Sequence, residues 1–189
     1  MAGHRNFVPY RRRPRCFFDT ETTGVLAGWN EITELAFKHD TLGIWSIRVR
    51  PKFMERAHPR ALEISGYNER DWADAPTIEE MWGRIVKFLT DVIVVGHNVA
   101  GFDLPMIEGE SRMKKLDRSN ISRAWEDTQG LAQTLLVPRG LKRVSLKACC
   151  DYFDIGNQGQ HHALEDVLRT EKVYERITRG QQGLFDVRG

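Results

Sequence analysis

The feature that most constrains the fold is a short run of apolar residues near the middle of the chain, Val92-Ile93-Val94-Val95, which ends at Gly96. A continuous apolar run of this length predicts a strand that is covered on both faces. Such a strand belongs in the sheet of an α/β domain, with helices packed against it. The run is also far shorter than the ~20 apolar residues that a membrane span requires.

Strand-like and helix-like segments surround this run in a definite order. Three strands are predicted at the start of the chain, over residues 16–21, 32–37 and 43–49. Helical spacing of apolar residues then predicts helices over residues 77–89, 105–115, 131–136 and 145–153 and from about residue 162. Thr77 and Glu80 have the spacing of a capping box. Three strands followed by alternating helix and strand predict a mixed α/β sheet with flanking helices.

The length of the chain, 189 residues, favours a single domain with its own core. Arginines are dense and acids absent at the start, so we expect a flexible basic arm over residues 1–13. One folded domain is expected over residues 14–179 and a flexible tail over residues 180–189.

The cysteines indicate a reducing environment. Their number is odd, and Cys149 and Cys150 are adjacent, so a disulfide framework is not expected. Like Cys16, they lie in apolar or helix-like runs, which predicts that they are buried as small apolar residues. No apolar segment typical of a secretion signal opens the sequence. We therefore expect a cytoplasmic protein with no membrane partner.

Four acidic residues lie where the predicted elements point them inward. Asp19 and Glu21 are two residues apart near the end of a strand, which places both carboxylates on one face. Asp103 follows the apolar strand, at the end of a sheet where α/β proteins bind ligands. Asp166 lies one turn into the last helix. Such a cluster of oxygen ligands suits Mg²⁺ or Mn²⁺, and two ions roughly 4 Å apart stabilise an in-line phosphoryl displacement.

His161 precedes Asp166 by five residues. Within one helix that spacing separates the two side chains by about 140°. They converge only if His161 lies on a loop, and the glycine-containing stretch 156–160 supplies one. A histidine there can take a proton from an attacking water. A surface position, or a zinc site formed by His161, His162 and Cys149 or Cys150, is the alternative.

Three segments that contain these residues resemble the exonuclease motifs of the DEDDh branch (DnaQ-like) of the ribonuclease H-like superfamily. They are Phe17-Phe18-Asp19-Thr20-Glu21-Thr22-Thr23-Gly24, Gly96-His97-Asn98-Val99-Ala100-Gly101-Phe102-Asp103 and His161-His162-Ala163-Leu164-Glu165-Asp166. Their order and spacing are typical of that branch. The resemblance extends over about residues 15–178. It implies a mixed five-stranded sheet of order 3-2-1-4-5, with strand 2 antiparallel.

The resemblance also implies an activity, that of a 3′→5′ exonuclease. The four acids would hold two divalent metal ions, Mg²⁺ or Mn²⁺, and His161 would be the general base. Water would attack the last phosphodiester and release a nucleoside 5′-monophosphate. We expect the substrate to be a single-stranded or frayed DNA 3′ end, in proofreading or end trimming. A 3′→5′ exoribonuclease, or a non-catalytic nucleic-acid-binding adaptor on the same fold, is the alternative.

Residues beside the acids are expected to hold the terminal nucleotides. By resemblance, Thr22 and Thr23 lie at the terminal sugar and Asn98 at the next nucleotide. Phe102 is expected to stack on a base or to pack in the core. Leu62 resembles the residue that wedges between the last two bases in the family, with a place in a helix core as the alternative.

Basic runs and a tail motif suggest partners. Residues 111–123 and 139–147 are rich in Lys and Arg, which is typical of solvated helix faces and of phosphate tracks. Gln181-Gln182-Gly183-Leu184-Phe185 resembles the Q-x-x-L-F peptide by which bacterial replication proteins bind the sliding clamp. Packing of the apolar pair against the domain is the alternative. A sliding clamp or a polymerase is therefore a candidate partner.

The formal net charge of +2 does not exclude a nucleic-acid partner. Five arginines and no acid fall within residues 1–18, so the rest of the chain is net negative. Four of those negative charges belong to the proposed metal ligands. Bound divalent ions would neutralise them and leave a positive total.

Overall fold

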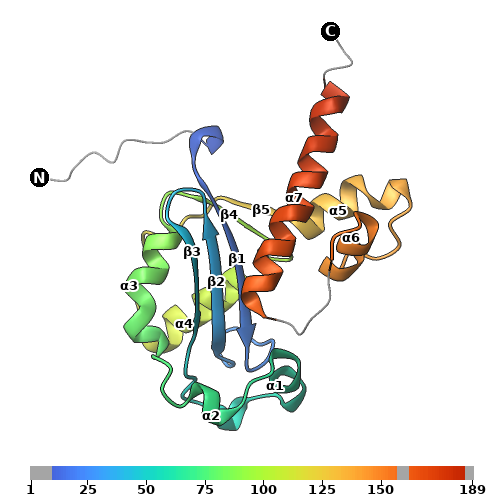
Figure 1. Ribbon diagram of the computed structural model, residues 1–189. Coiled ribbons are helices and arrows are strands. Elements are labelled where there is room, and N and C mark those ends of the chain that lie inside the picture. The colour runs from blue at the N-terminus through green and yellow to red at the C-terminus, as the bar shows by residue number, and fades with distance from the viewer. Residues whose placement is uncertain (1–9, 157–161, 186–189) are drawn as a thin grey trace, which may run out of the picture.

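The structure, a computed structural model, describes the backbone of residues 10–156 and 162–185 and side chains as far as Arg179. At its centre is a five-stranded sheet (Figure 1). The strands are β1 (Arg15–Thr22), β2 (Ile32–His39), β3 (Gly43–Arg48), β4 (Ile93–Gly96) and β5 (Trp125–Asp127). Their order is β3-β2-β1-β4-β5, and β2 runs antiparallel to β1 and β3 while β4 is parallel to β1 and β5. The predicted order 3-2-1-4-5 with an antiparallel strand 2 is confirmed.

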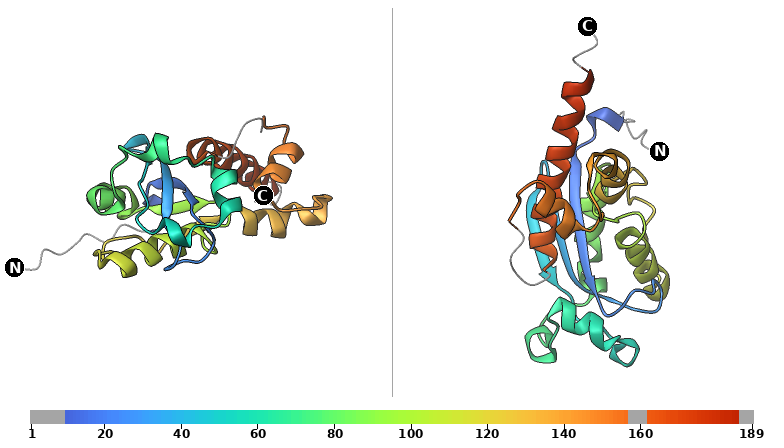
Figure 2. Two further views of the ribbon diagram at one scale, coloured as in Figure 1. Left: turned by 90° about the horizontal axis from the view of Figure 1, so that it is seen from below. Right: turned by 90° about the vertical axis from the view of Figure 1, so that its right-hand side faces the viewer.

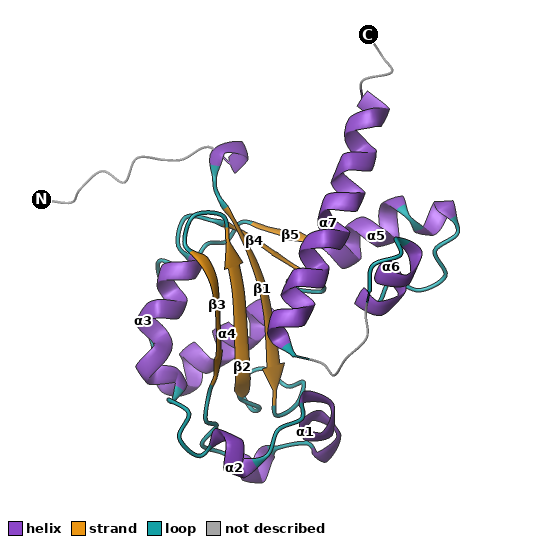
Figure 3. Cartoon of the chain, in the orientation of Figure 1, coloured by secondary structure: helices purple, strands orange, loops and turns teal. Residues whose placement is uncertain are grey.

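Helices connect and cover the strands (Figure 3). They are α1 (Pro59–Ser65), α2 (Glu69–Trp72), α3 (Ile78–Leu89), α4 (Asp103–Lys114), α5 (Thr128–Leu135), α6 (Leu146–Tyr152) and α7 (Ala163–Phe185). At the start of α3, the Thr77 N–H donates to the Glu80 carboxylate over 2.6 Å. This is the reciprocal half of the predicted capping box.

Alternate residues of the strands pack against opposite layers. Phe18 of β1 belongs to a buried cluster with Ile85 of α3 and Met106 of α4. Its neighbour Phe17 belongs to a second cluster with Val167 of α7 on the other face. Figure 2 shows the sheet edge-on, with α7 on one side and α3 and α4 on the other. Alternation along β1 therefore supplies side chains to the clusters on both faces of the sheet. It also determines which face the acidic side chains of this strand lie on.

A third apolar cluster lies away from the sheet, where α5 and α6 pack against α7. It contains Ala132 of α5, Cys149 and Cys150 of α6, and Val173 of α7. All three cysteines of the chain are buried free thiols. The expectation that they are buried small apolar residues, without a disulfide, is confirmed.

Four elements differ from the sequence expectations. β5 is a three-residue strand that apolar periodicity did not indicate, because its first residue, Trp125, is exposed. The short helices α1 and α2 were likewise not predicted as elements. The last helix continues to Phe185, through residues 180–185 that were placed in a flexible tail. None of the described helices is apolar enough over a long enough stretch to cross a membrane.

Candidate active site

Strand β1 carries the first two acids of the site. Asp19 and Glu21 share the face of β1 that Phe17 occupies, which is the face covered by α7. In the ladder with β2, Asp19 lies opposite Ala36 and Glu21 opposite Glu34. Both acids are half-buried. The sequence prediction that the two carboxylates share one face is therefore borne out.

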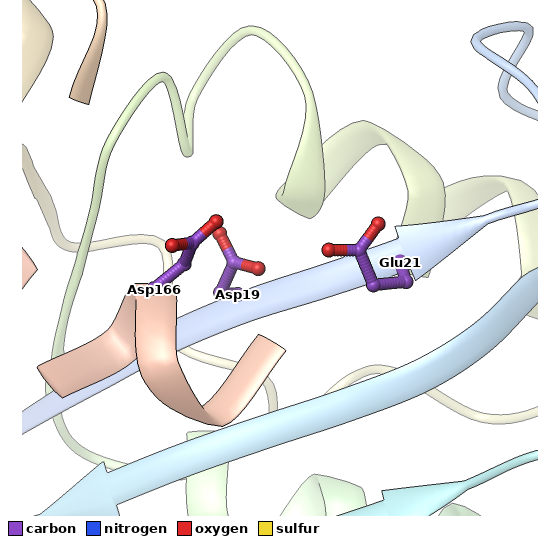
Figure 4. A group of neighbouring side chains, drawn as sticks. All are labelled: Asp19, Glu21 and Asp166. Carbon is purple, nitrogen blue, oxygen red and sulfur yellow. The ribbon is translucent and has the colours of Figure 1, made fainter. Parts of the chain in front are cut away.

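The first turn of α7 brings Asp166 to the same place. The Asp166 N–H donates to the carbonyl of His162 over 3.1 Å, which fixes this turn just after the chain enters the helix. Carboxylate oxygens of Asp19, Glu21 and Asp166 all lie within 4.8 Å of one another. Figure 4 shows the three side chains converging from the strand and the helix.

Asp103, the fourth predicted acid, lies beside this group at the first position of α4. It is almost fully buried, and one carboxylate oxygen accepts hydrogen bonds from the Thr20 N–H over 2.9 Å and from the Thr20 hydroxyl over 2.8 Å. Thr20 therefore ties Asp103 to β1, between the two acids of that strand. Asp103 is outside the set that shares 4.8 Å, yet its charge raises the pKa of Asp19.

The electrostatics of the site favour protons or cations. Burial raises the pKa of Asp19 well above its ordinary value, and the charges of Asp103 and Asp166 raise it further. Burial, followed by Asp166 and Glu34, raises the pKa of Glu21 to about 8. Burial also raises the pKa of Asp103 to about 7, although the two bonds from Thr20 oppose the shift. Moreover, no described residue donates a hydrogen bond to the carboxylate of Asp19 or Glu21.

Among the described residues, one cation contacts the site. Arg169, one turn beyond Asp166 on α7, places its Nη1 2.7 Å from the Asp166 carboxylate and its Nη2 3.0 Å from Glu165. Arg169 is not among the site residues predicted from the sequence. Its spacing of three residues from Asp166 on a helix was the signal that it would reach the acid.

The donor set fits hard divalent cations. Every ligand atom in the converging group is a carboxylate oxygen, which Mg²⁺ and Mn²⁺ prefer. Burial and then mutual repulsion raise the pKa values of Asp19 and Glu21, and a divalent ion that replaces the protons supplies the missing counter-charge. Asp19, Glu21 and Asp166 are thus able to hold a metal, and Asp103 is placed to add a fourth carboxylate.

A further acid, Asp127, holds the loop that leads to Asp103. Its carboxylate accepts the N–H groups of Asn98 over 2.9 Å and Ala100 over 3.2 Å, and it caps α5 through the N–H of Gln129. Asn98 adopts a left-handed backbone conformation. A Cβ on Gly101 would lie 2.5 Å from the Asn98 amide oxygen, so any larger residue at this turn would displace the Asn98 side chain.

His161, the predicted general base, lies outside the described residues. Its neighbour His162 is described, and its Nδ1 lies 3.8 Å from the carboxylate of Glu34 on β2. Cys149 and Cys150 belong to the apolar cluster of α5, α6 and α7. Among the described residues, the group able to hold a metal contains carboxylates alone, so nothing supports the zinc alternative.

The predicted substrate-binding residues have local roles in the chain. The Thr22 hydroxyl donates to the Gly24 carbonyl over 2.7 Å, and the Thr23 hydroxyl accepts the Glu31 N–H over 2.9 Å. Phe102 is half-buried and packs against the cluster of α3 and α4, which favours its core interpretation. Leu62 is half-buried on α1. Contact of these residues with substrate stays a prediction.

A hollow beside the first motif was not predicted. A cavity of about 440 Å³ opens between the segment that follows β1 and the start of α1, and its lining includes Gly24, Leu26, Trp29 and Ile64. Trp29 is half exposed, and the Arg56 guanidinium lies 4.6 Å from the centre of its ring. The cavity therefore presents apolar and aromatic surface within a few residues of Glu21.

Known proteins are similar to this chain in sequence. The chain is 28% identical over 166 residues to a PolC-type DNA polymerase III of Caldanaerobacter subterraneus, a match that covers 85% of this chain and 11% of that protein. It is 29% identical over 168 residues to a DNA polymerase III epsilon subunit of Aquifex aeolicus, covering 84% and 77%. This chain thus spans about a tenth of the length of the PolC-type relative.

The fold also matches solved structures. A zinc-bound complex of E. coli exonuclease I with single-stranded DNA superposes with a TM-score of 0.77 at 19% identity, over 93% of this chain and 42% of that one. The model of the exonuclease family matches residues 16–174, which hold the four acids and the loop between them. The chain therefore belongs to the exonuclease family, and its predicted class, the DnaQ-like 3′→5′ exonucleases on a ribonuclease H-like fold, is confirmed.

Proposed function

We propose that this chain hydrolyses the terminal phosphodiester at the 3′ end of single-stranded or frayed DNA, releasing nucleoside 5′-monophosphates. The observation that carries the proposal is the convergence of Asp19, Glu21 and Asp166 within 4.8 Å, beside the buried Asp103. DNA is favoured because the relatives above are named as a PolC-type DNA polymerase III and as a DNA polymerase III epsilon subunit.

Two divalent metal ions are the proposed cofactors. The four acids would hold them, with Thr20 orienting Asp103 and Arg169 orienting Asp166. When bound, such ions stabilise the attacking and leaving oxygens of an in-line displacement. The raised pKa values of Glu21 and Asp103 are consistent with a site that exchanges protons for metal.

His161 is the proposed general base, on the strength of its position in the third motif. It would take the proton of the attacking water. Replacement His161→Ala is expected to slow hydrolysis by about 100-fold or more and to leave metal affinity unchanged. Unaltered turnover in this variant would reject the role.

The cavity between the segment after β1 and the start of α1 is the proposed place for an unpaired base. Leu26 and Trp29 offer it a flat apolar surface, and base stacking on an aromatic ring does not depend on the identity of the base. A frayed or single-stranded end supplies an unpaired base without the cost of opening a duplex. Nothing in the described residues is assigned as a reader of the ribose 2′-hydroxyl, which distinguishes RNA from DNA.

The test compares a site acid with an exposed acid. Asp19→Asn keeps the shape of the side chain and removes its charge, and we expect it to reduce mononucleotide release from a 3′-labelled strand in Mg²⁺ by more than about 100-fold. Asp91→Asn is the control, because Asp91 is exposed and its left-handed backbone suits asparagine. Equal losses in both variants, or no release by the unmodified chain, would overturn the proposal.

Matched DNA and RNA oligomers decide between the two nucleic acids. The proposal expects faster release from the DNA strand of the same sequence. Faster release from RNA would replace it by the exoribonuclease alternative. Binding of both strands with release from neither would instead indicate the non-catalytic adaptor.

The sliding clamp stays a proposed partner. The backbone of Gln181–Phe185 forms the last turns of α7. A clamp pull-down with the unmodified chain and with the Leu184→Ala/Phe185→Ala variant tests the motif. The proposal expects recovery of the unmodified chain alone, and equal recovery would remove it.

A further inference from the structure

The two basic runs of the sequence have different surroundings in the fold. In residues 111–123, Lys114 is buried between the carboxylates of Glu31 and Glu110, at 2.7 and 2.6 Å. Arg112 and Arg118 both lie against Glu108. Most of the charge of this run is therefore neutralised within the chain.

The second run keeps its charge free for a partner. Arg139, Lys142 and Arg143 are exposed. No ion pair or side-chain hydrogen bond joins them to any part of the chain that the structure describes. Only Lys147, at the end of the run, has an acid partner there, Asp151 at 2.8 Å.

The segment that carries these cations is held at both ends. It leaves α5 through a 3-10 turn, Val137–Arg139, and Gly140 follows with a φ of 102°, a left-handed conformation that favours glycine. Leu141 is then buried in the cluster of α5, α6 and α7, and Val144 packs against it. Lys142 and Arg143 lie between these two anchors, so their backbone is fixed while their side chains face solvent.

His97 connects this segment to the loop of the second motif. Its Nε2 lies 2.7 Å from the Val144 carbonyl, which can only accept, so Nε2 donates. Its Nδ1 lies 2.9 Å from the Thr128 hydroxyl. Burial lowers the pKa of His97, which favours the neutral ring. The neutral ring can donate through Nε2 and accept at Nδ1. The same histidine directly follows Gly96 of β4 and precedes Asn98.

The basic segment is thereby attached to the edge of the sheet where the acids gather. Asp127 holds Asn98 and Ala100 a few residues before Asp103, and its neighbour Thr128 contacts His97. In Figure 1, α5 and α6 lie beside α7 on the β5 side of the sheet. An acidic centre with an adjacent cationic segment matches a strand whose end is cleaved and whose remaining phosphates need counter-charges.

We propose that Arg139, Lys142 and Arg143 bind the phosphodiester backbone of the substrate strand, on the 5′ side of the nucleotide that is removed. The inference rests on the proposed nuclease function and extends it, because it selects one of the two basic runs as the binding track. Contacts to phosphates carry no base preference, so the track serves any sequence.

The experiment measures the salt dependence of binding. A fluorescent oligothymidylate of roughly 15 nucleotides is titrated, in Mg²⁺, with the Asp19→Asn chain and with the same chain carrying Lys142→Gln/Arg143→Gln. Each lost phosphate contact on a single strand reduces the slope of log K against log salt by about 0.7, so the pair is expected to reduce it by about 1.4. Arg112→Gln/Arg118→Gln is the matched control, and its slope is expected to stay unchanged.

The outcomes separate this inference from the proposed function. A smaller slope in the 142/143 variant alone supports the track, even if the unmodified chain were to release no nucleotide. Equal slopes in all chains overturn it, even if hydrolysis is observed, and so does an equal loss in the control or an absence of measurable binding. Thermal melting checks that the exposed substitutions leave the fold intact.

Discussion

Two clusters of buried or half-buried acids in this chain differ in how their charge is neutralised. At Glu31 and Glu110, the carboxylates surround the ammonium group of Lys114, and backbone N–H groups of Ile32, Lys52 and Phe53 complete their bonds. At Asp19 and Glu21, no such donor is present among the described residues. One cluster therefore contains its own cation, and the other must obtain a cation or a proton from solution.

The pKa values express this difference. Burial alone would lower the pKa of Lys114, but Glu110 and Glu31 raise it, so the lysine stays charged. Burial and, to a smaller extent, the neighbouring acids together raise the pKa of Glu21 to about 8. The first cluster, formed by Lys114, Glu31 and Glu110, is an ion-pair network that joins α4 to the start of β2, and we call it the clasp. The second is a site whose stability depends on what it binds.

Removing the internal cation is expected to have the largest effect on stability. Lys114→Met leaves Glu31 and Glu110 buried without a counter-charge, because their side chains are 1% and 0% exposed. Breaking such a buried pair costs about 3–5 kcal/mol. Urea unfolding measures the loss, and Lys115→Met, at the exposed neighbouring position, is the control. A loss below about 1 kcal/mol would show that the clasp is not the stabilising feature described here.

Much of the site, but not the clasp, was predictable from the sequence. The period of two in β1 placed Asp19 and Glu21 on one face, and the resemblance of the three motifs to the DEDDh branch implied that Asp103 and Asp166 join them. The short-range spacing of apolar residues also predicted the α/β class and the helices that carry Asp103 and Asp166. Such patterns depend only on neighbours in the sequence.

The remaining parts depend on contacts between distant segments. Lys114 meets Glu31 only because α4 packs beside β2, and Asp127 meets Asn98 only because β5 lies next to β4. Neither pair has a spacing that a sequence pattern reveals. β5 itself has three residues and an exposed Trp125, too little for a period to show.

The pH dependence of stability should distinguish the metal site from the clasp. An acid whose pKa is higher in the folded chain than in the unfolded chain favours folding at low pH, and this contribution is lost as pH rises through the folded value. For Glu21, with a folded pKa of about 8, the metal-free chain should lose about 3 kcal/mol between pH 5 and 8. Unfolding free energies measured in EDTA across this range test the sign.

Two controls accompany the pH series. Glu21→Gln removes the titrating group, so its stability should fall less steeply with pH. Saturating Mg²⁺ should flatten the curve of the unmodified chain, because metal replaces the protons. A stability that rises with pH in EDTA, or one that is equally steep in Glu21→Gln, would contradict the electrostatic account of the site.

The smallest effect concerns the residue that orients Asp103. Thr20→Val keeps the shape and the backbone bond but removes the hydroxyl that donates over 2.8 Å. Loss of this bond should destabilise the chain by about 1 kcal/mol and raise the pKa of Asp103 above about 7, moving the pH profile of hydrolysis upward. Thr20→Ser, which retains the hydroxyl, should behave like the unmodified chain. Identical profiles for Val and Ser would exclude a positioning role for Thr20.

The most direct test of the central claim, that Asp19 and Glu21 lack the internal counter-cation that Glu31 and Glu110 have in Lys114, is a calorimetric titration with Mn²⁺ at pH 7. The experiment is run in two buffers of different ionisation enthalpy, so that proton release is measured along with binding. We predict that the unmodified chain and Lys115→Met bind Mn²⁺ with release of protons, and that Asp19→Asn binds at least about tenfold more weakly. No binding at millimolar Mn²⁺, or equal affinity in Asp19→Asn, would contradict the account.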